Sequence, residues 1–114
     1  MKQMNSMLSV SAVALLAIVT LPAQAADVAK GEQLAQAQCA ACHGKDFKTG
    51  IDPSYPKLAG QYPEYLEKAL RDYQSGARKN PIMAGLAKPL SRADIQNLAA
   101  YLSGLPGPLS NEKR

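Results

Sequence analysis

The sequence predicts an all-α domain in which helices and long loops surround a bound group. Three segments carry the start or stop signals of helices, two of them with apolar stripes, and no stretch of any length alternates between apolar and polar residues as a surface strand does. The connections at residues 44–62 and 77–90 are long and punctuated by Gly and Pro. Loops of that length in a small domain usually wrap a ligand.

A first helix is expected over about residues 28–38, where Ala, Gln and Leu dominate. Asp27 supplies its N-cap. Gly31 sits inside this helix at a cost of about 1 kcal/mol relative to Ala. A glycine at that position indicates close packing against another helix.

A second helix begins at Pro63 and ends near Gly76. Its apolar residues recur at helical spacing on one face, at Leu66, Ala69, Leu70 and Tyr73. The outer face is expected to be wet and to carry two ion pairs four residues apart, Glu64 with Lys68 and Glu67 with Arg71.

The third helix has the clearest boundaries. Ser91 is a strong N-cap, and Asp94 completes a capping-box pattern. Gly104 ends the helix, and the prolines that follow prevent it from resuming. The stripe expected to be buried consists of Ile95, Leu98, Ala99 and Leu102.

The N-terminus has the pattern of an export signal. Lys2 supplies a positive charge, residues 7–21 are uncharged and mostly apolar, and residues 22–25 end in a small-residue A-x-A site. A retained anchor is the alternative, but a helix of about 15 residues rises only ~22 Å, less than the ~30 Å hydrocarbon core of a bilayer. We therefore expect residues 1–25 to be a cleaved secretory signal and residues 26–114 to form one domain in the periplasm.

The size and charge of the chain narrow its possible partners. Removing 25 of the 114 residues leaves 89, near the lower end of what buries a sufficient core unaided. The formal charge is +4 for the whole chain and +3 without Lys2. Basic residues are scattered, with no run longer than Arg78-Lys79 and no interleaved aromatics for base stacking. These features argue against nucleic acid as a partner.

The run that points to chemistry is Cys39-Ala40-Ala41-Cys42-His43. Its two thiols and its imidazole stand at offsets i, i+3 and i+4, on one face of a single helical turn. This spacing is typical of covalent haem attachment. Cys39 and Cys42 would form thioether bonds to the two vinyl groups of one haem c, and His43 would be the proximal iron ligand.

Three other interpretations of these residues are weaker. A redox C-x-x-C dithiol normally opens a helix after a strand, and no Val/Ile-rich strand precedes Cys39. Structural zinc needs four protein ligands, whereas the chain has two cysteines and one histidine, so carboxylates would have to complete the site. A disulfide between Cys39 and Cys42 would close too short a loop to stabilise the fold much.

Met83 is the leading candidate for the second axial ligand of the iron. The other three methionines leave with the export signal, so Met83 would be the only one in the mature chain. A gap-filling core methionine is the alternative. Its placement in the loop around residues 80–85, rather than on a helix stripe, favours ligation, and His/Met ligation is an established arrangement.

Most of residues 27–105 resemble the class I c-type cytochromes, both the small single-haem bacterial proteins and the individual halves of two-haem bacterial cytochromes. Four features support the resemblance: the Cys39–His43 run, Pro56-Lys57-Leu58-Ala59-Gly60, Met83, and Leu98-Ala99-Ala100-Tyr101-Leu102. Only one C-x-x-C-H run is present, so a two-haem protein is not a match for the whole chain.

The resemblance implies the class I cytochrome c fold, in which the terminal helices cross at a glycine and an aromatic, here Gly31 and Tyr101. It implies that the carbonyl of Pro56 accepts a hydrogen bond from His43. It also implies that Pro56 and Leu58 belong to the haem pocket.

With both axial positions filled, no site is open for a substrate, so the expected function is single-electron transport in a periplasmic respiratory chain, without enzymatic activity. The partners would be redox proteins, with no stable membrane span in the processed chain. Loop lysines could steer acidic docking surfaces, although plain solvation explains them equally well: Lys45, Lys48, Lys57, Lys79 and Lys88. Two alternatives remain open, a haem subunit of a periplasmic dehydrogenase or oxidase, and an open-site haem enzyme if Met83 does not ligate.

Overall fold

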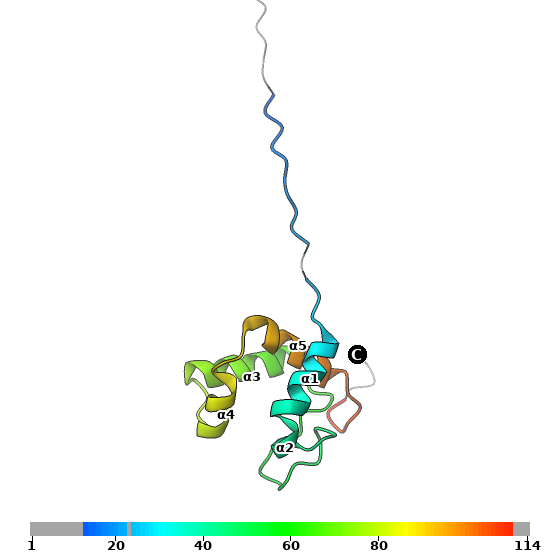
Figure 1. The fold of residues 1–114 in the computed structure, drawn as a ribbon, viewed down its shortest axis with the longest axis vertical. Helices are drawn as coiled ribbons and strands as arrows, with labels where there is room; N and C mark the ends of the chain where they lie inside the picture. Colours follow the sequence, from blue (N-terminus) through cyan, green and yellow to red (C-terminus); the bar gives the residue numbers. More distant parts are fainter. Residues whose placement is uncertain (1–12, 23, 111–114) are drawn as a thin grey trace, which may run out of the picture.

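Five helices build the domain (Figure 1). The computed structural model describes residues 13–22 and 24–110, and these residues form no β-strand. In chain order the helices are α1 (Val28–Gln38), α2 (Ala40–His43), α3 (Pro63–Ser75), α4 (Pro81–Ala87) and α5 (Arg92–Ser103). The all-α prediction is confirmed, and the three predicted helices correspond to α1, α3 and α5.

The first and last long helices, α1 and α5, cross in close contact (Figure 1). A Cβ atom added to Gly31 would lie 2.0 Å from the carbonyl oxygen of Asn97 and 3.0 Å from the Cβ of Tyr101. Only a residue without a side chain allows the two backbones to approach so closely. The Asn97 side chain also accepts a 2.7 Å hydrogen bond from the backbone N–H of Asp27. The expected crossing at Gly31 and Tyr101 is therefore confirmed.

The helix ends have the capping residues that the sequence indicates. Asp27 Oδ1 accepts the backbone N–H of Lys30 at 3.1 Å. Ser91 and Asp94 form a reciprocal capping box, in which each backbone N–H donates to the other side chain at 2.9 and 3.0 Å. Gly76 ends α3 in the left-handed conformation, with φ of 82°. These contacts satisfy backbone groups that have no partner inside a helix.

One of the two ion pairs expected on α3 forms, and the other is replaced. Arg71 Nη1 lies 3.0 Å from Glu67 Oε2. Lys68 pairs with Asp72, one turn further along the helix, instead of with Glu64. Both partners stand four residues from Lys68, so spacing alone does not choose between them. Glu64 lies in the first turn of α3, where the helix dipole favours an acidic side chain without a basic partner.

Residues 77–90 contain a helix that was expected to be a loop. The Asn80 side chain accepts hydrogen bonds from the backbone N–H groups of Ile82 and Met83, at 3.0 and 3.1 Å. Pro81 follows at the first helical position, which suits its fixed φ. The seven-residue length of α4 and its internal Gly85 hide it in the sequence. The prediction that Met83 lies in a loop is therefore wrong, because Met83 lies on α4.

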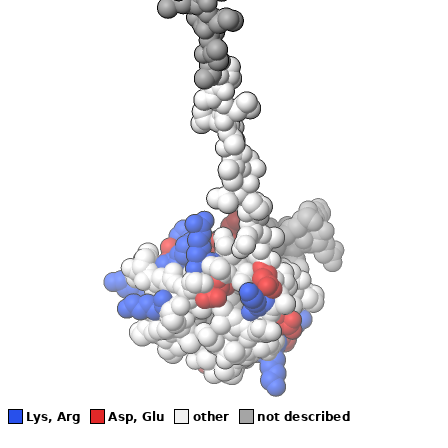
Figure 2. Space-filling model, turned by 45° about the horizontal axis from the view of Figure 1, so that its top comes forward, with Lys and Arg blue, Asp and Glu red and all other residues white. Residues whose placement is uncertain are grey.

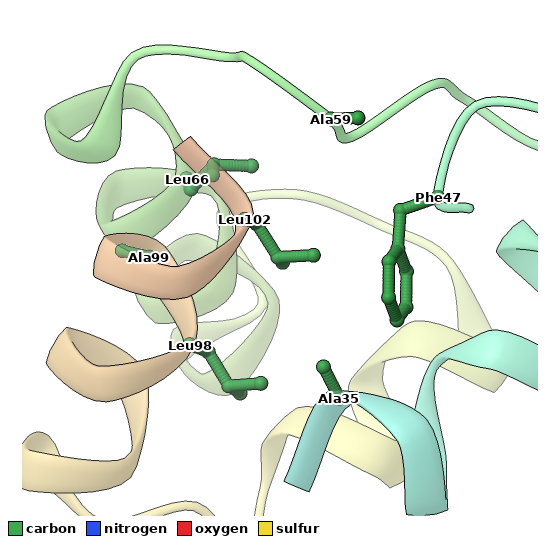
Figure 3. Packing of buried hydrophobic residues seen from close by; sticks show 7 residues of the cluster. All are labelled: Ala35, Phe47, Ala59, Leu66, Leu98, Ala99 and Leu102. Carbon is green, nitrogen blue, oxygen red and sulfur yellow. The ribbon is translucent and has the colours of Figure 1, made fainter. Parts of the chain in front are cut away.

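The core lies between α1, α3, α5 and the loop after α2 (Figure 3). The stripe expected on the last helix is buried in full. The main cluster consists of Ala35, Phe47, Ala59, Leu66, Leu98, Ala99 and Leu102. Several of these are alanines, so the cluster offers less apolar area than one of the same size built from larger side chains.

Phe47 is a large core residue that the sequence did not reveal. Its φ of 57° lies in the left-handed region, which is rare for a side chain of this size. Its ring is fully buried, points toward Ala35 (Figure 3), and meets the ring of Tyr101 edge-on at a centroid distance of 5.9 Å. Its carbonyl accepts the backbone N–H groups of Leu58 and Ala59 at 2.7 and 3.0 Å. Burial and these two hydrogen bonds offset the backbone strain.

The described residues ahead of α1 are exposed and form no helix. Across 13–22 and 24–110, no helix is long and apolar enough to cross a membrane. Most of the segment expected to be an export signal, residues 1–12 and 23, lies outside the described residues, and its cleavage stays a prediction.

Replacing Gly31 with Ala should destabilise the fold by ~1–3 kcal/mol, because the new methyl group would overlap the Asn97 carbonyl. Chemical denaturation of the haem-containing protein would measure the loss. Gly85→Ala is the matched control, since a Cβ there meets no atom within 4 Å. We expect the control to be neutral or to gain up to ~1 kcal/mol from its better helix propensity. Equal stability of Gly31→Ala and wild type would refute the close approach of α1 and α5.

Candidate functional site

A cavity of about 570 Å³ opens between the helices. Its lining comes from the end of α1, from α2, from the loop after α2, and from α3, α4 and α5. Much of the lining is aliphatic, including Leu58, Leu66, Leu70, Leu98 and Leu102. The volume lies within the ~300–1,000 Å³ that is usual for cofactor and ligand pockets. The cavity can therefore hold a large, mainly apolar group.

One wall of the cavity carries the whole C-x-x-C-H motif. Cys39, Cys42 and His43 all line it, and both thiols are free. Cys39 is the residue that joins α1 to α2, and α2 is a single turn, so the expected placement of the three side chains on one helical turn is confirmed. The disulfide alternative is absent from the structure.

His43 is held by one hydrogen bond to the backbone. Its side chain is 6% exposed, and Nδ1 lies 2.8 Å from the carbonyl oxygen of Pro56. A carbonyl can only accept, so Nδ1 donates and carries the proton in the neutral ring. The lone pair of Nε2 is then available to a metal. The hydrogen bond that the resemblance implied between Pro56 and His43 is present.

The thiol of Cys39 is unsuited to a redox dithiol. Burial raises the pKa of Cys39 to about 11, whereas reactive dithiols depend on a lowered pKa and a thiolate at neutral pH. Among residues 13–22 and 24–110, no group of three or more His, Cys, Asp or Glu side chains is placed so that it could hold a metal ion. That part of the chain supplies no ligand set for structural zinc.

The loop after α2 brings Pro56 to His43. The Asp46 carboxylate accepts the backbone N–H groups of Lys48 and Thr49 at 3.0 and 2.8 Å, and these bonds hold the pKa of Asp46 below its ordinary value. Gly44 turns the chain with φ of 87°, and a Cβ there would lie 2.0 Å from the Thr49 carbonyl oxygen. A tight turn thus follows directly on the C-x-x-C-H motif.

Another wall of the cavity is formed by α4, which carries Met83. Met83 is partly buried and lines the cavity together with Ile82 and Leu86 of the same helix. The apolar stripe expected on α3 also faces this space, because all four of its residues, Leu66, Ala69, Leu70 and Tyr73, line it. Part of the face that would normally join a protein core is therefore turned toward the cavity.

Arg78 and Tyr65 are polar residues at the cavity that were not anticipated from the sequence. Arg78 donates from Nη1 to the hydroxyl of Tyr65 at 3.3 Å, and its guanidinium carbon lies 5.1 Å from the ring centroid of Tyr73. All three line the cavity, as does Tyr55, whose ring stands edge-on to His43. In the sequence, Arg78 stood out only as part of the basic pair Arg78-Lys79. That pair does not indicate that Arg78 lies beside a pocket.

The loop lysines do not gather at the cavity. Lys57 is exposed and lines it, whereas Lys48 Nζ donates to the carbonyl of Pro106 at 3.4 Å. On the face drawn in Figure 2, basic and acidic side chains are interspersed. Steering by all five lysines stays a prediction, with Lys57 the one that lies at the candidate site.

The sequence model of the family described as Cytochrome c matches residues 28–106, which is more than half of the chain. The chain belongs to the cytochrome c family. Together with the C-x-x-C-H spacing, this identifies its cofactor as one covalently bound haem c, and the predicted class I fold is confirmed by solved relatives.

Three similar proteins illustrate the family. The thiosulfate dehydrogenase electron acceptor of Stutzerimonas stutzeri is 40% identical over 96 residues, 80% of this chain and 44% of that protein. Cytochrome c-554(548) of Halomonas halodenitrificans is 43% identical over 82 residues, 69% of this chain and 96% of that protein. The crystal structure of reduced recombinant cytochrome c4 from Pseudomonas stutzeri has a TM-score of 0.63 and 36% identity, with 72% of this chain and 51% of that one covered. The chain thus spans about half the length of the thiosulfate dehydrogenase electron acceptor and of cytochrome c4.

Proposed function

We propose that this protein is a single-electron carrier whose haem iron is held between His43 and Met83. The observation that supports this most is a single cavity lined by both side chains, the imidazole being fixed at Nδ1 by the Pro56 carbonyl. Met83 is also the only methionine after residue 25. Two protein ligands on the iron leave no open position for a substrate, and the thioether raises the reduction potential.

Haem bound in this way supplies reversible one-electron exchange between Fe(III) and Fe(II). Cys39 and Cys42 would hold the haem through thioether bonds. The Pro56 carbonyl keeps the imidazole of His43 in the tautomer whose Nε2 can bind iron. Leu58 and the leucines of α3 and α5 exclude water from the pocket.

The donors and acceptors are proposed by analogy. One relative is named as the electron acceptor of thiosulfate dehydrogenase. We therefore propose that this chain takes electrons from a dehydrogenase and delivers them to a respiratory chain, with Lys57 attracting acidic partners. A haem subunit in permanent association with such an enzyme would use the same redox chemistry.

The site of action is proposed to be the periplasm, after removal of residues 1–25. The exported protein should then begin at Ala26, as the A-x-A pattern ahead of it indicates. Intact mass measurement of the protein from a periplasmic fraction checks this. A chain that retains Met1 and sediments with membranes would show that the segment is an anchor.

Both cysteines should be needed for full attachment of the haem. After denaturation in acid and organic solvent, the wild-type chain should keep its haem, since thioether bonds survive such treatment. Cys39→Ser and Cys42→Ser should each give a sharply reduced yield of haem-containing protein. The single variants should hold any remaining haem through one thioether bond, and the double variant should release all of it. Extraction of haem from the wild type would contradict the proposed bonds.

Replacing Met83 with Ala should open the sixth coordination position. We expect the near-infrared band of methionine-ligated ferric haem to disappear, carbon monoxide to bind the ferrous form, and the potential to fall by a substantial part of the ~0.8 V that axial ligands span. Leu86→Ala is the matched control, because it removes a side chain of α4 that lines the same cavity without removing sulfur. If the wild type already binds carbon monoxide readily, the open-site enzyme becomes the better hypothesis.

A further inference from the structure

The side chain of Gln74 links α3 to the end of α4 and to the segment that precedes α5. Gln74 lies in the last turn of α3, and its Nε2 donates to the carbonyl of Ala87 at 2.8 Å and to the carbonyl of Leu90 at 2.9 Å. Ala87 is the last residue of α4, and Leu90 directly precedes the N-cap of α5. One amide group therefore fixes the junction between α4 and α5 to α3.

Helix α4 needs contacts with the rest of the fold to be stable. With seven residues, α4 is far shorter than the ~12–15 residues at which isolated helices become marginally stable. Its first turn is held locally by the Asn80 cap. Its last carbonyls have no partner inside the helix, and that of Ala87 accepts both Gln74 and the backbone N–H of Leu90. Gln74 thus supplies a long-range contact at the C-terminal end of α4.

The fixed end of α4 lies one turn beyond Met83. Residues 83 and 87 are four apart and therefore share a face of the helix. Ala87 is fully buried, and both residues line the cavity together with Leu70 and Tyr73 of α3. A contact that holds Ala87 against α3 consequently restricts the position of the Met83 sulfur.

We infer that Gln74 is the positioning residue for the distal ligand, holding α4 against α3 so that Met83 stays on the iron. This inference rests on the proposed ligation by Met83. Loss of the amide donors leaves the Ala87 carbonyl with only the Leu90 N–H and removes the Gln74 donor from the Leu90 carbonyl, which lets α4 move away from the cavity while the rest of the fold remains. The sixth position then opens more often, without any change in the ligands themselves.

The test compares Gln74→Leu with Gln36→Leu in the full haem-containing protein. Gln36 is the matched control, because its Nε2 also donates to a backbone carbonyl, that of Lys45 at 3.4 Å, but it lies on α1. The readouts are the near-infrared methionine–iron band of the ferric protein and the rate of carbon monoxide binding to the ferrous protein. Gln74→Leu should weaken the band and bind carbon monoxide about tenfold faster than wild type, the size expected for two lost hydrogen bonds. Gln36→Leu should match wild type in both.

If Gln74→Leu and wild type bind carbon monoxide at equal rates and both keep the near-infrared methionine–iron band, the inference is overturned. The proposed ligation by Met83 would still hold. A wild type without the band would instead refute the proposed ligation itself. If Gln74→Leu does not accumulate as folded protein, Gln74→Glu at neutral pH serves in its place, because a carboxylate of the same shape cannot donate. A faster rate in Gln36→Leu equal to that of Gln74→Leu would show general loosening and would also overturn the inference.

Discussion

The hydrogen bond from His43 Nδ1 to the carbonyl of Pro56 is the contact around which the site is organised. Thirteen residues separate the two partners, and the loop between them has no helix of its own. Local contacts give this loop its shape: the Gly44 turn, the Asp46 carboxylate, and the carbonyl of Phe47, which receives two backbone N–H groups. Each brings the chain back toward α2, so the orientation of one imidazole depends on the whole segment.

The division of apolar residues between core and cavity follows from the small size of the domain. All four residues of the α3 stripe line the cavity, whereas only Leu98 and Leu102 of the buried α5 stripe do so. A chain this short buries a limited fraction of its surface. Haem bound in the cavity would therefore complete the apolar interior, and its binding free energy would contribute to the stability of the fold. The long loops have a structural role for the same reason, because they close the pocket around the cofactor.

The sequence revealed what depends on local rules. A few adjacent residues were enough to predict four features that the structure has. These are the caps at Asp27 and Ser91, the close approach at Gly31 and the C-x-x-C-H turn. What it did not reveal depends on tertiary context. The helix that carries Met83 is short and contains a glycine. The left-handed conformation of Phe47 is offset by burial of its ring and by hydrogen bonds to distant residues. Gln74 gave no signal, since its partners lie 13 and 16 residues away. The roles of Cys39 and Cys42 toward the haem, and of His43 and Met83 toward its iron, stay predictions.

The crossing of α1 and α5 also constrains the order in which the molecule can be assembled. The hydrogen bond between Asp27 and Asn97 spans 70 positions, close to the full length of the domain. A chain made from its N-terminus cannot form this contact until α5 has emerged, and closing so long a loop is slow. During that interval the Cys39–His43 turn, which directly follows α1, remains accessible. The late formation of this contact thus provides a period in which the two thiols can react before the pocket closes.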